Sequence, residues 1–199
     1  MRDTVDFTWL PVPMQAELAE LVKRFGQPVM GSADLGDSPY LRKVVERRFA
    51  EVCMVVRRAS GRLLVFRKPF YPAGVFRLLT GGVEANESIH SALLREVHEE
   101  TGLTTLVERF LAASTYLCDA QPQFASFAFL LEERGGTLGA LDPDERVESF
   151  RDIAVSHLLE IAQQLEQLAD EYNAELDADI SQWGLLRALN HRLVWEALQ

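Results

Sequence analysis

One stretch of the chain, residues 81 to 103, constrains the fold more than any other. It reads GGVEANESIHSALLREVHEETGL, with two glycines at its start and one near its end. Residues 88 to 101 include neither Gly nor Pro, and apolar residues recur there at helical spacing. Gly102 is the residue type most common just after the C-terminus of a helix. The stretch therefore predicts a glycine turn followed by one helix of about four turns.

Three acidic side chains fall in one sector of this helix. Glu96, Glu99 and Glu100 are neighbours on its surface, because residues three and four apart lie one turn from each other. Like charges at this spacing repel each other, and no lysine lies among them. A hard cation that prefers oxygen ligands, Mg²⁺ or Mn²⁺, would supply the missing positive charge. An isolated acidic group of this kind is more often a solvated helix face, so the wider pattern decides the interpretation.

The wider pattern is that of a known family. It runs Gly, five residues, Glu, seven residues, then Arg-Glu-apolar-any-Glu-Glu-any-Gly-apolar, and every specified position is filled. This string resembles the signature motif of the Nudix hydrolases. The resemblance implies an α/β/α sandwich with a mixed β-sheet, extended here by helical additions at both ends. It also implies metal-dependent cleavage of the pyrophosphate in a nucleoside diphosphate that is joined to another group.

Two positions near the glycine turn depart from the family pattern. Thr80 stands where a proline often precedes the two glycines, and Asn86 stands where a glycine often precedes the first glutamate. Asn is the non-glycine residue that best tolerates a positive φ. We therefore expect the turn to be intact.

The resemblance implies roles for individual residues. The metal ligands would be Glu96, Glu99, Glu100 and the carbonyl oxygen of Gly81. The candidate catalytic residues are these three glutamates together with Arg95, which would form a structural ion pair with Glu87, and Glu145. Loops after the sheet can lend a further ligand or the general base in this family. Glu145 and Glu148 of the acidic segment 141–148 are the candidates for that role, against a plain surface role.

Basic and aromatic residues just before the glycine turn are candidates for contacts to the substrate. Those nearest the motif are Arg67, Lys68 and Arg77 for the phosphates, and Phe70, Tyr71 and Phe76 for stacking on a base. Of these we expect Arg67, Arg77 and Phe76 to bind substrate. The alternative is that the cations are solvated strand ends and that the aromatic residues are part of the core.

The substrate itself is expected from the family rather than from residues. A nucleotide sugar such as ADP-ribose is the first candidate, because such substrates are common in the family and the chain is long. Nucleoside triphosphates and dinucleoside polyphosphates come next. A regulator that binds a nucleotide without cleaving it is a different class of function, but such relatives often lose carboxylates of the motif, and this chain has them all.

The chain is acidic, with 30 Asp and Glu residues against 20 Lys and Arg residues and a net charge of −10. This balance disfavours a nucleic-acid partner, since such binding depends on basic contacts to phosphate. A naked acidic cleft would also repel a pyrophosphate, whereas bound Mg²⁺ or Mn²⁺ reverses the local charge. We therefore expect a small-molecule partner, a nucleoside diphosphate derivative, and we leave open a homodimer.

The first residues do not resemble a secretory signal, and no stretch of the sequence is expected to span a membrane. Residues 1–6 include acids where a secretory signal would be basic and then apolar, and no apolar run has the length of a membrane span. A cytoplasmic protein with no membrane partner is the expectation. Cys53 and Cys118 lie in apolar stretches without metal-ligand spacing, so they are predicted to be buried free thiols.

The rest of the chain divides around the motif. We expect an N-terminal helical extension at 1–49, a Nudix domain at 50–170 and a C-terminal helix at 171–199 that packs on the core or on a second subunit. Helices are predicted at 13–25, 40–49, 156–169 and 180–198, strands at 51–58, 62–67, 75–79, 107–117, 124–132 and 149–154, and a loop at 26–39.

Overall fold

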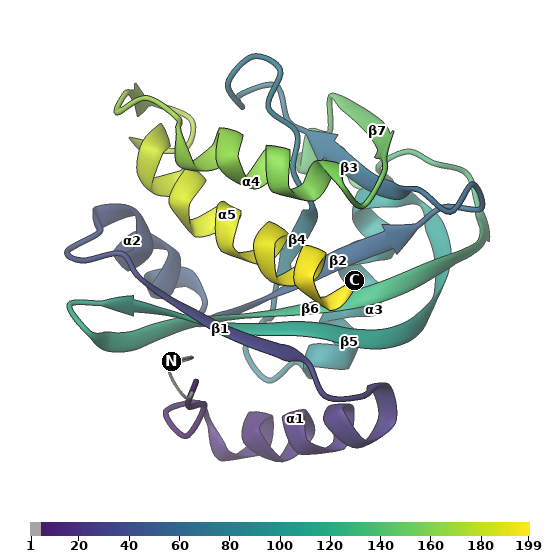
Figure 1. Cartoon of the computed structure of the whole chain (residues 1–199), viewed down its shortest axis with the longest axis horizontal. Helices are drawn as coiled ribbons and strands as arrows, with labels where there is room; N and C mark the ends of the chain where they lie inside the picture. Colours follow the sequence, from purple (N-terminus) through teal and green to yellow (C-terminus); the bar gives the residue numbers. More distant parts are fainter. Residues whose placement is uncertain (1–4) are drawn as a thin grey trace.

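The computed structural model describes residues 5–199 and shows a mixed β-sheet with helices on both faces (Figure 1). The strands of this sheet are β1 (Val29–Asp34), β2 (Ala50–Arg57), β3 (Leu63–Arg67), β4 (Leu79–Gly82), β5 (Leu103–Cys118), β6 (Gln121–Gly136) and β7 (Ser149–Ile153). Their order is β1-β5-β6-β2-β3-β7, and β4 also pairs with β2. The pairs β1–β5 and β2–β6 are parallel, and the others are antiparallel.

The helices cover the two faces of the sheet unequally. They are α1 (Val12–Phe25), α2 (Pro39–Arg47), α3 (Ile89–Thr101), α4 (His157–Glu166) and α5 (Ile180–Ala197). Buried residues of α1 and α3 share one hydrophobic cluster with the sheet, and those of α2, α4 and α5 share the other. In Figure 1, α1 lies below the sheet, and α4 and α5 lie above it. The predicted α/β/α sandwich with a mixed sheet and helices at both ends is confirmed.

The sequence of β2 is almost continuously apolar because both faces of this strand are buried. Cys53 and Val55 point to the α4–α5 face, whereas Val52, Met54 and Val56 point to the α3 face. This alternation is the period of two that a strand imposes, and both faces are covered by helices. The predicted burial of the two free cysteines is confirmed as well.

Helix α3 begins and ends where its sequence predicts. The side chain of Ser88 accepts a hydrogen bond from the Ser91 amide at 3.0 Å and so caps the N-terminus. Gly102 ends the helix with a left-handed φ of 66°. The apolar side chains Leu93 and Val97 are buried against the sheet. The helix is therefore held rigidly, and its remaining face is free for chemistry.

The predicted loop at 26–39 is wrong for its central part, which forms the edge strand β1. Residues 29–34 pair in parallel with residues 112–117 of β5. Gly31 and Ser32 have little intrinsic preference for a strand, so the sequence of this segment gives no local signal. The pairing partner decides the conformation, and a Cβ at Gly31 would lie only 2.8 Å from the Leu193 methyl groups of α5.

The predicted strand at 75–79 is also displaced. Residues 75–78 make one isolated bridge, between Arg77 and Phe66, and the strand proper is β4, which includes both glycines of the motif. Gly81 and Gly82 pair with Val52 and Glu51 of β2. The start of the motif is thus part of the sheet and not a free turn.

Short elements complete the chain. A 3₁₀ helix, η1 (Pro143–Glu145), precedes β7, and two short strands, β8 (Tyr172–Asn173) and β9 (Ala178–Asp179), pair between α4 and α5. Residues 1–4, which enter the expectation about localisation, lie outside the described residues. Within residues 5–199, none of the helices combines the length and the apolar character that a bilayer crossing demands.

The imidazole of His191 ties α5 to the segment before β4. Its Nε2 accepts a hydrogen bond from the Leu78 amide at 3.0 Å, and its Nδ1 donates to the Arg187 carbonyl at 2.9 Å. Both bonds together require the neutral ring with its proton on Nδ1. Burial, with a contribution from the charges of Arg77 and Arg187, lowers the pKa of His191 to about 4.

The free energy of unfolding is therefore expected to fall as the pH is lowered from about 6.5 to about 4. In this window an unfolded chain binds a proton at His191 that the folded chain does not bind. The contribution is complete above pH 6.5 and decreases by up to about 3 kcal/mol at pH 4. Urea unfolding between pH 7 and pH 4 measures it. His191→Gln should flatten this dependence relative to the exposed control His98→Gln, and equal slopes in the two variants would contradict the assignment.

Candidate active site

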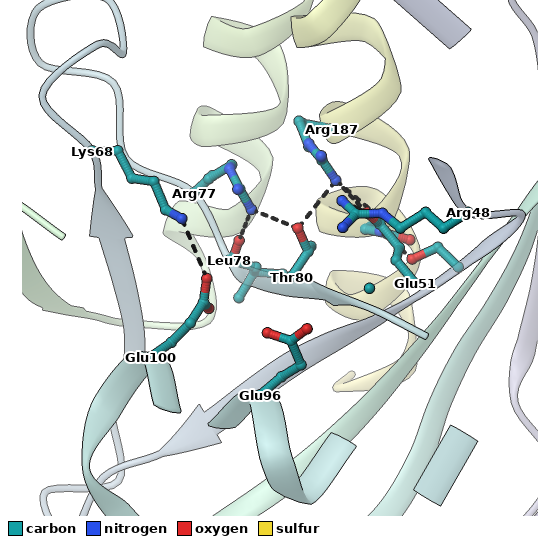
Figure 2. A network of polar contacts seen from close by, with 12 residues as sticks. Arg48, Glu51, Lys68, Arg77, Leu78, Thr80, Glu96, Glu100 and Arg187 are labelled. Carbon is teal, nitrogen blue, oxygen red and sulfur yellow. Dashed lines mark hydrogen bonds and ion pairs between the residues drawn. The ribbon is translucent and has the colours of Figure 1, made fainter. Parts of the chain in front are cut away.

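Three carboxylates converge beside β4. Glu96 and Glu100 lie one turn apart on α3, and Glu145 comes from η1. One oxygen from each lies within 4.8 Å of the others. Figure 2 shows Glu96 and Glu100 on the same side of the polar network, next to the chain that carries Thr80. The folded chain therefore brings two motif carboxylates together with a third from a loop more than 40 residues further on.

The surroundings of these carboxylates separate their proton affinities. Burial raises the pKa of Glu96 and raises that of Glu100 well above its ordinary value. Burial also raises the pKa of Glu145, but a hydrogen bond from Lys68 and the charge of that lysine outweigh it, so this pKa lies below its ordinary value. Glu100 thus retains a proton at a pH where Glu145 is ionised.

The three carboxylates fit a divalent cation. Oxygen ligands are what Mg²⁺ and Mn²⁺ prefer, and three of them converge here. Oε2 of Glu100 is buried and has no hydrogen-bond partner among the described residues, which is costly for a polar atom unless a ligand contacts it. A cation would contact this oxygen and offset the repulsion between the carboxylates.

Gly81 provides the surface against which Glu96 lies. A Cβ built at Gly81 would overlap the carboxylate of Glu96, so no larger residue fits there while Glu96 keeps its position. The requirement for glycine here comes from this close approach. The backbone of Gly81 therefore lies against the carboxylate of Glu96. A carbonyl oxygen of Gly81 that binds the same cation as Glu96 would have to lie this close.

Replacing Gly81 by Ala is expected to lower kcat about a hundredfold, because it displaces the Glu96 carboxylate by an ångström or more. Stability should change by no more than about 1 kcal/mol, because the displaced atoms are at the end of a flexible side chain. Steady-state kinetics and urea unfolding give the two quantities. Gly135→Ala is the matched control, because a Cβ there meets nothing within 4 Å. Full activity of Gly81→Ala would show that the position of Glu96 is unimportant.

Arg95 holds the loop and the helix of the motif together. Its Nε and Nη2 each lie 2.8 Å from a different oxygen of Glu87, and Nη2 also donates to the Gly82 carbonyl at 3.0 Å. Its Nη1 lies 3.0 Å from Glu99 and 3.1 Å from Glu96. The ion pair that the family resemblance implies is therefore present. Hydrogen bonding to Glu87 is the main reason that the pKa of Arg95 is raised.

A cavity of about 330 Å³ has in its lining Lys68, which contacts Glu100 and Glu145. Its lining includes six cations and four aromatic residues, namely Lys43, Arg47, Arg48, Lys68, Arg77 and Arg187 with Tyr40, Phe70, Tyr71 and Trp183. Glu175 and Asp177 are the acidic residues in the lining. In a chain of net charge −10, this is a local concentration of positive charge. Such a cavity suits an anionic ligand that also has a flat ring system.

Lys68 belongs to both the carboxylate group and the cavity. Its Nζ lies 2.7 Å from Glu145 Oε2 and 3.7 Å from Glu100 Oε1 (Figure 2 shows the second contact), and its side chain lines the cavity. Arg77 lines the same cavity from the chain before β4. Two candidates for phosphate contacts, Lys68 and Arg77, thus line the same cavity, and their contact with phosphate stays a prediction.

Other predicted site residues lie elsewhere. Glu99 is partly exposed, contacts Arg95 and is not one of the three converging carboxylates. Arg67 lies 3.4 Å from Glu148, away from the cavity lining, so Glu148 is engaged in that pair rather than with the carboxylates. Phe76 lines a second, smaller cavity and packs under the guanidinium of Arg151 at 4.0 Å. The structure does not bring Phe76 to the basic cavity.

Sequence analysis missed the cavity residues that come from α2 and α5. Arg187 is 5% exposed and contacts Glu51, yet it lies more than 80 residues after the motif. One signal for it exists: Arg187, Asn190 and His191 share the buried face of α5 with Trp183. Polar residues in the apolar stripe of a helix indicate buried partners. Nothing local in the sequence of α2 distinguishes its cavity-lining cations from ordinary surface charges.

The sequence of the chain is similar to those of known proteins. The profile of the NUDIX domain matches residues 47–178. The chain is similar to an ADP-ribose pyrophosphatase of Methanocaldococcus jannaschii, with 34% identity over 97 residues, which is 48% of this chain and 57% of that protein. It is also similar to the NAD-capped RNA hydrolase NudC of Vibrio atlanticus, with 30% identity over 87 residues, which is 43% of this chain and 31% of that protein. The matched part thus spans little more than half of the first relative and about a third of the second.

Solved structures resemble the chain more weakly. A UDP-X diphosphatase superposes with a TM-score of 0.46 and 18% identity, covering 93% of this chain and 71% of the other. An ADP-ribose pyrophosphatase of Streptococcus suis gives a TM-score of 0.43 and 14% identity, covering 75% and 91%. The domain profile covers well over half of the 199 residues and includes the complete motif on α3. This chain belongs to the Nudix family.

Proposed function

We propose that this protein is a Mg²⁺- or Mn²⁺-dependent pyrophosphohydrolase that cleaves a nucleoside diphosphate linked to another group. One observation carries the proposal: Lys68 contacts two of the three converging carboxylates and also lines the cation-rich cavity. A diphosphate bound in that cavity would lie beside the carboxylates. The side chain of Lys68 then connects the residues that would bind the metal to the cationic residues that would bind the substrate.

Different carboxylates would bind the metal and accept the proton. Glu96 and Glu100 would hold the cation, together with the Gly81 carbonyl that the motif implies. Glu99, the third ligand that the motif implies, contacts Arg95 and would support the site from outside. A cation bound there supplies Lewis-acid charge to phosphate oxygens and lowers the pKa of a coordinated water. Glu145 is the candidate general base, because its carboxylate is ionised before substrate binds and is partly exposed.

Positive side chains would orient the phosphates. Lys68 and Arg77 lie on the cavity side of the carboxylates, where they would bind phosphate oxygens and offset the charge that develops on the leaving group. Arg77 is positioned for this by hydrogen bonds to Tyr71 Oη at 2.9 Å and to Thr80 Oγ1 at 3.0 Å. A fixed guanidinium loses little entropy when it binds a phosphate.

ADP-ribose or another nucleotide sugar is the first candidate substrate. Support comes from the similarity to the ADP-ribose pyrophosphatase of M. jannaschii and from a cavity that combines aromatic residues with cations. Phe70 is partly exposed in that lining and could stack on a base. Nucleoside triphosphates and dinucleoside polyphosphates are the alternatives, and they would leave different products.

Product chromatography on a substrate panel tests the proposal. ADP-ribose, other nucleotide sugars, NADH, coenzyme A, dinucleoside polyphosphates and nucleoside triphosphates would each be incubated with Mg²⁺, with Mn²⁺ and with EDTA. AMP and ribose 5-phosphate from ADP-ribose, formed only with metal, are the expected result. Cleavage of another compound would replace the substrate candidate. Nucleotide binding without any cleavage would instead favour a sensor.

A further inference from the structure

Two buried arginines of the cavity lining converge on one hydroxyl, that of Thr80. Nη1 of Arg77 donates to Thr80 Oγ1 at 3.0 Å, and Nη1 of Arg187 donates to the same oxygen at 3.1 Å. Figure 2 shows the two side chains reaching Thr80 from different elements, with Glu96 on the far side of that strand. Both arginines are 5% exposed, and both line the cavity.

The positive charge of this pair is only partly neutralised. Arg187 is paired with Glu51, whose two oxygens lie 2.9 and 2.7 Å from Nη1, and Arg48 lies 4.0 Å from the same carboxylate. One buried carboxylate thus faces two guanidinium groups, those of Arg187 and Arg48. A buried charge without a counter-ion is costly, so this part of the cavity lining favours an additional anion.

Arg77 makes no ion pair within the described residues. Its hydrogen bonds go to the neutral oxygens of Tyr71, Leu78 and Thr80, and its guanidinium lies 4.8 Å from the centre of the Phe66 ring. Glu100 and Glu145, two of the converging carboxylates, are paired with Lys68. The charge of Arg77 is therefore available to a ligand.

Each guanidinium also retains a free donor atom. The hydrogen bonds of Arg187 use Nη1, and those of Arg77 use Nη1 and Nε. In residues 5–199 neither Nη2 has a hydrogen-bond partner, and neither is among the fully buried unpaired atoms. Because both side chains line the cavity, these two Nη2 groups are accessible from it.

We propose that Arg77 and Arg187 form a clamp for a phosphate group of the nucleotide substrate, beside the metal site and independent of the metal. Two converging guanidinium groups match the tetrahedral array of phosphate oxygens and form charge-assisted hydrogen bonds with it. That the phosphate belongs to a substrate rests on the proposed function; the anion site itself does not. The clamp also explains why Thr80 departs from the family pattern, since a proline could not accept hydrogen bonds from both arginines.

Metal-free binding tests the clamp. Titration calorimetry in EDTA, with AMP and with inorganic pyrophosphate as probes, is expected to show binding to the wild-type protein. Arg77→Gln should weaken the affinity about tenfold or more by removing one charged donor. This variant leaves no carboxylate unpaired, so it is expected to fold. Arg109→Gln, the same change at an exposed position on β5, should bind like wild type.

Variants of Thr80 test how the clamp is oriented. Thr80→Val removes the shared acceptor and should weaken AMP binding several-fold, whereas Thr80→Ser retains the hydroxyl and should restore it. A purely structural role of the hydroxyl would lower the unfolding midpoint of Thr80→Val without changing the affinity of the folded protein. That outcome, or wild-type affinity in Arg77→Gln, would overturn the clamp.

The outcomes separate this proposal from the proposed function. Metal-free binding that depends on Arg77, in a protein that cleaves nothing, would support the clamp and contradict the pyrophosphohydrolase. Turnover without any metal-free binding of AMP or pyrophosphate would support the pyrophosphohydrolase and contradict the clamp. Binding of pyrophosphate but not of AMP would overturn the assignment of the clamp to a nucleotide phosphate.

Discussion

Replacing Glu100 by Gln is expected to lower kcat by at least about a thousandfold, as the loss of a central electrostatic group in an active site does. The substitution removes a side chain that can ionise when a cation binds, and with it one metal ligand, but keeps the volume of the side chain. Glu100 is 1% exposed, and its Oε2 has no hydrogen-bond partner in the described part of the chain. Its neutral form is already favoured by burial, so the amide should not destabilise the fold.

Two measurements distinguish this effect from misfolding. Calorimetric titration with Mn²⁺ should show weakened metal binding in Glu100→Gln, while its urea midpoint stays within the range of wild type. Glu171→Gln, at an exposed position before β8, is the matched control and should change neither quantity. If Glu100→Gln loses activity but binds Mn²⁺ normally, Glu100 is not a metal ligand and its role would be proton transfer.

Glu99 gives a comparison within the same helix. The motif makes it a metal ligand, but its carboxylate contacts Arg95 and lies outside the three converging carboxylates. Glu99→Gln is therefore expected to cost about ten- to hundredfold in activity, as outer contacts of a metal site typically do. A loss as large as that of Glu100→Gln would establish Glu99 as a direct ligand and would require its side chain to leave Arg95.

Local signals explain how much of this architecture is predictable from the sequence. Helix α3 carries its own N-cap, apolar stripe and C-terminal glycine, so Ser88 and Gly102 define it without any tertiary information. The strand β2 is predictable for a similar reason, because it is apolar on both faces. Its burial between two layers leaves no alternative structure for so apolar a run.

Long-range partners explain what the sequence does not show. β1 is a strand only because β5 pairs with it, and its own residues include Gly31 and Ser32. The approach of Glu145 to Glu100 depends on the path of a loop. Arg187 joins the site because α5 packs across the sheet, which apolar periodicity predicts without giving its position. Contacts of this kind are set by packing rather than by neighbours in the sequence.

The ion pair between Arg187 and Glu51 is expected to have the second largest effect, on stability. Arg187→Met leaves the carboxylate of Glu51, which is 0% exposed, without its closest partner. Breaking a buried pair in this way costs about 3–5 kcal/mol, a large share of the roughly 5–15 kcal/mol that stabilises a typical domain. Urea unfolding measures the loss. Arg192→Met on the same helix breaks the more exposed pair with Glu166 and should cost about 1 kcal/mol or less.

A double-mutant cycle shows whether the cost comes from the unpaired carboxylate. Glu51→Gln alone leaves Arg187 without its buried counter-ion, so it should also be strongly destabilising. The double variant Glu51→Gln/Arg187→Met has neither charge. Its loss in free energy of unfolding should be smaller by about 2–3 kcal/mol than the sum of the two single losses. Strict additivity would mean that the two residues are not coupled. Positive coupling would show that Glu51 compensates the buried charge of Arg187.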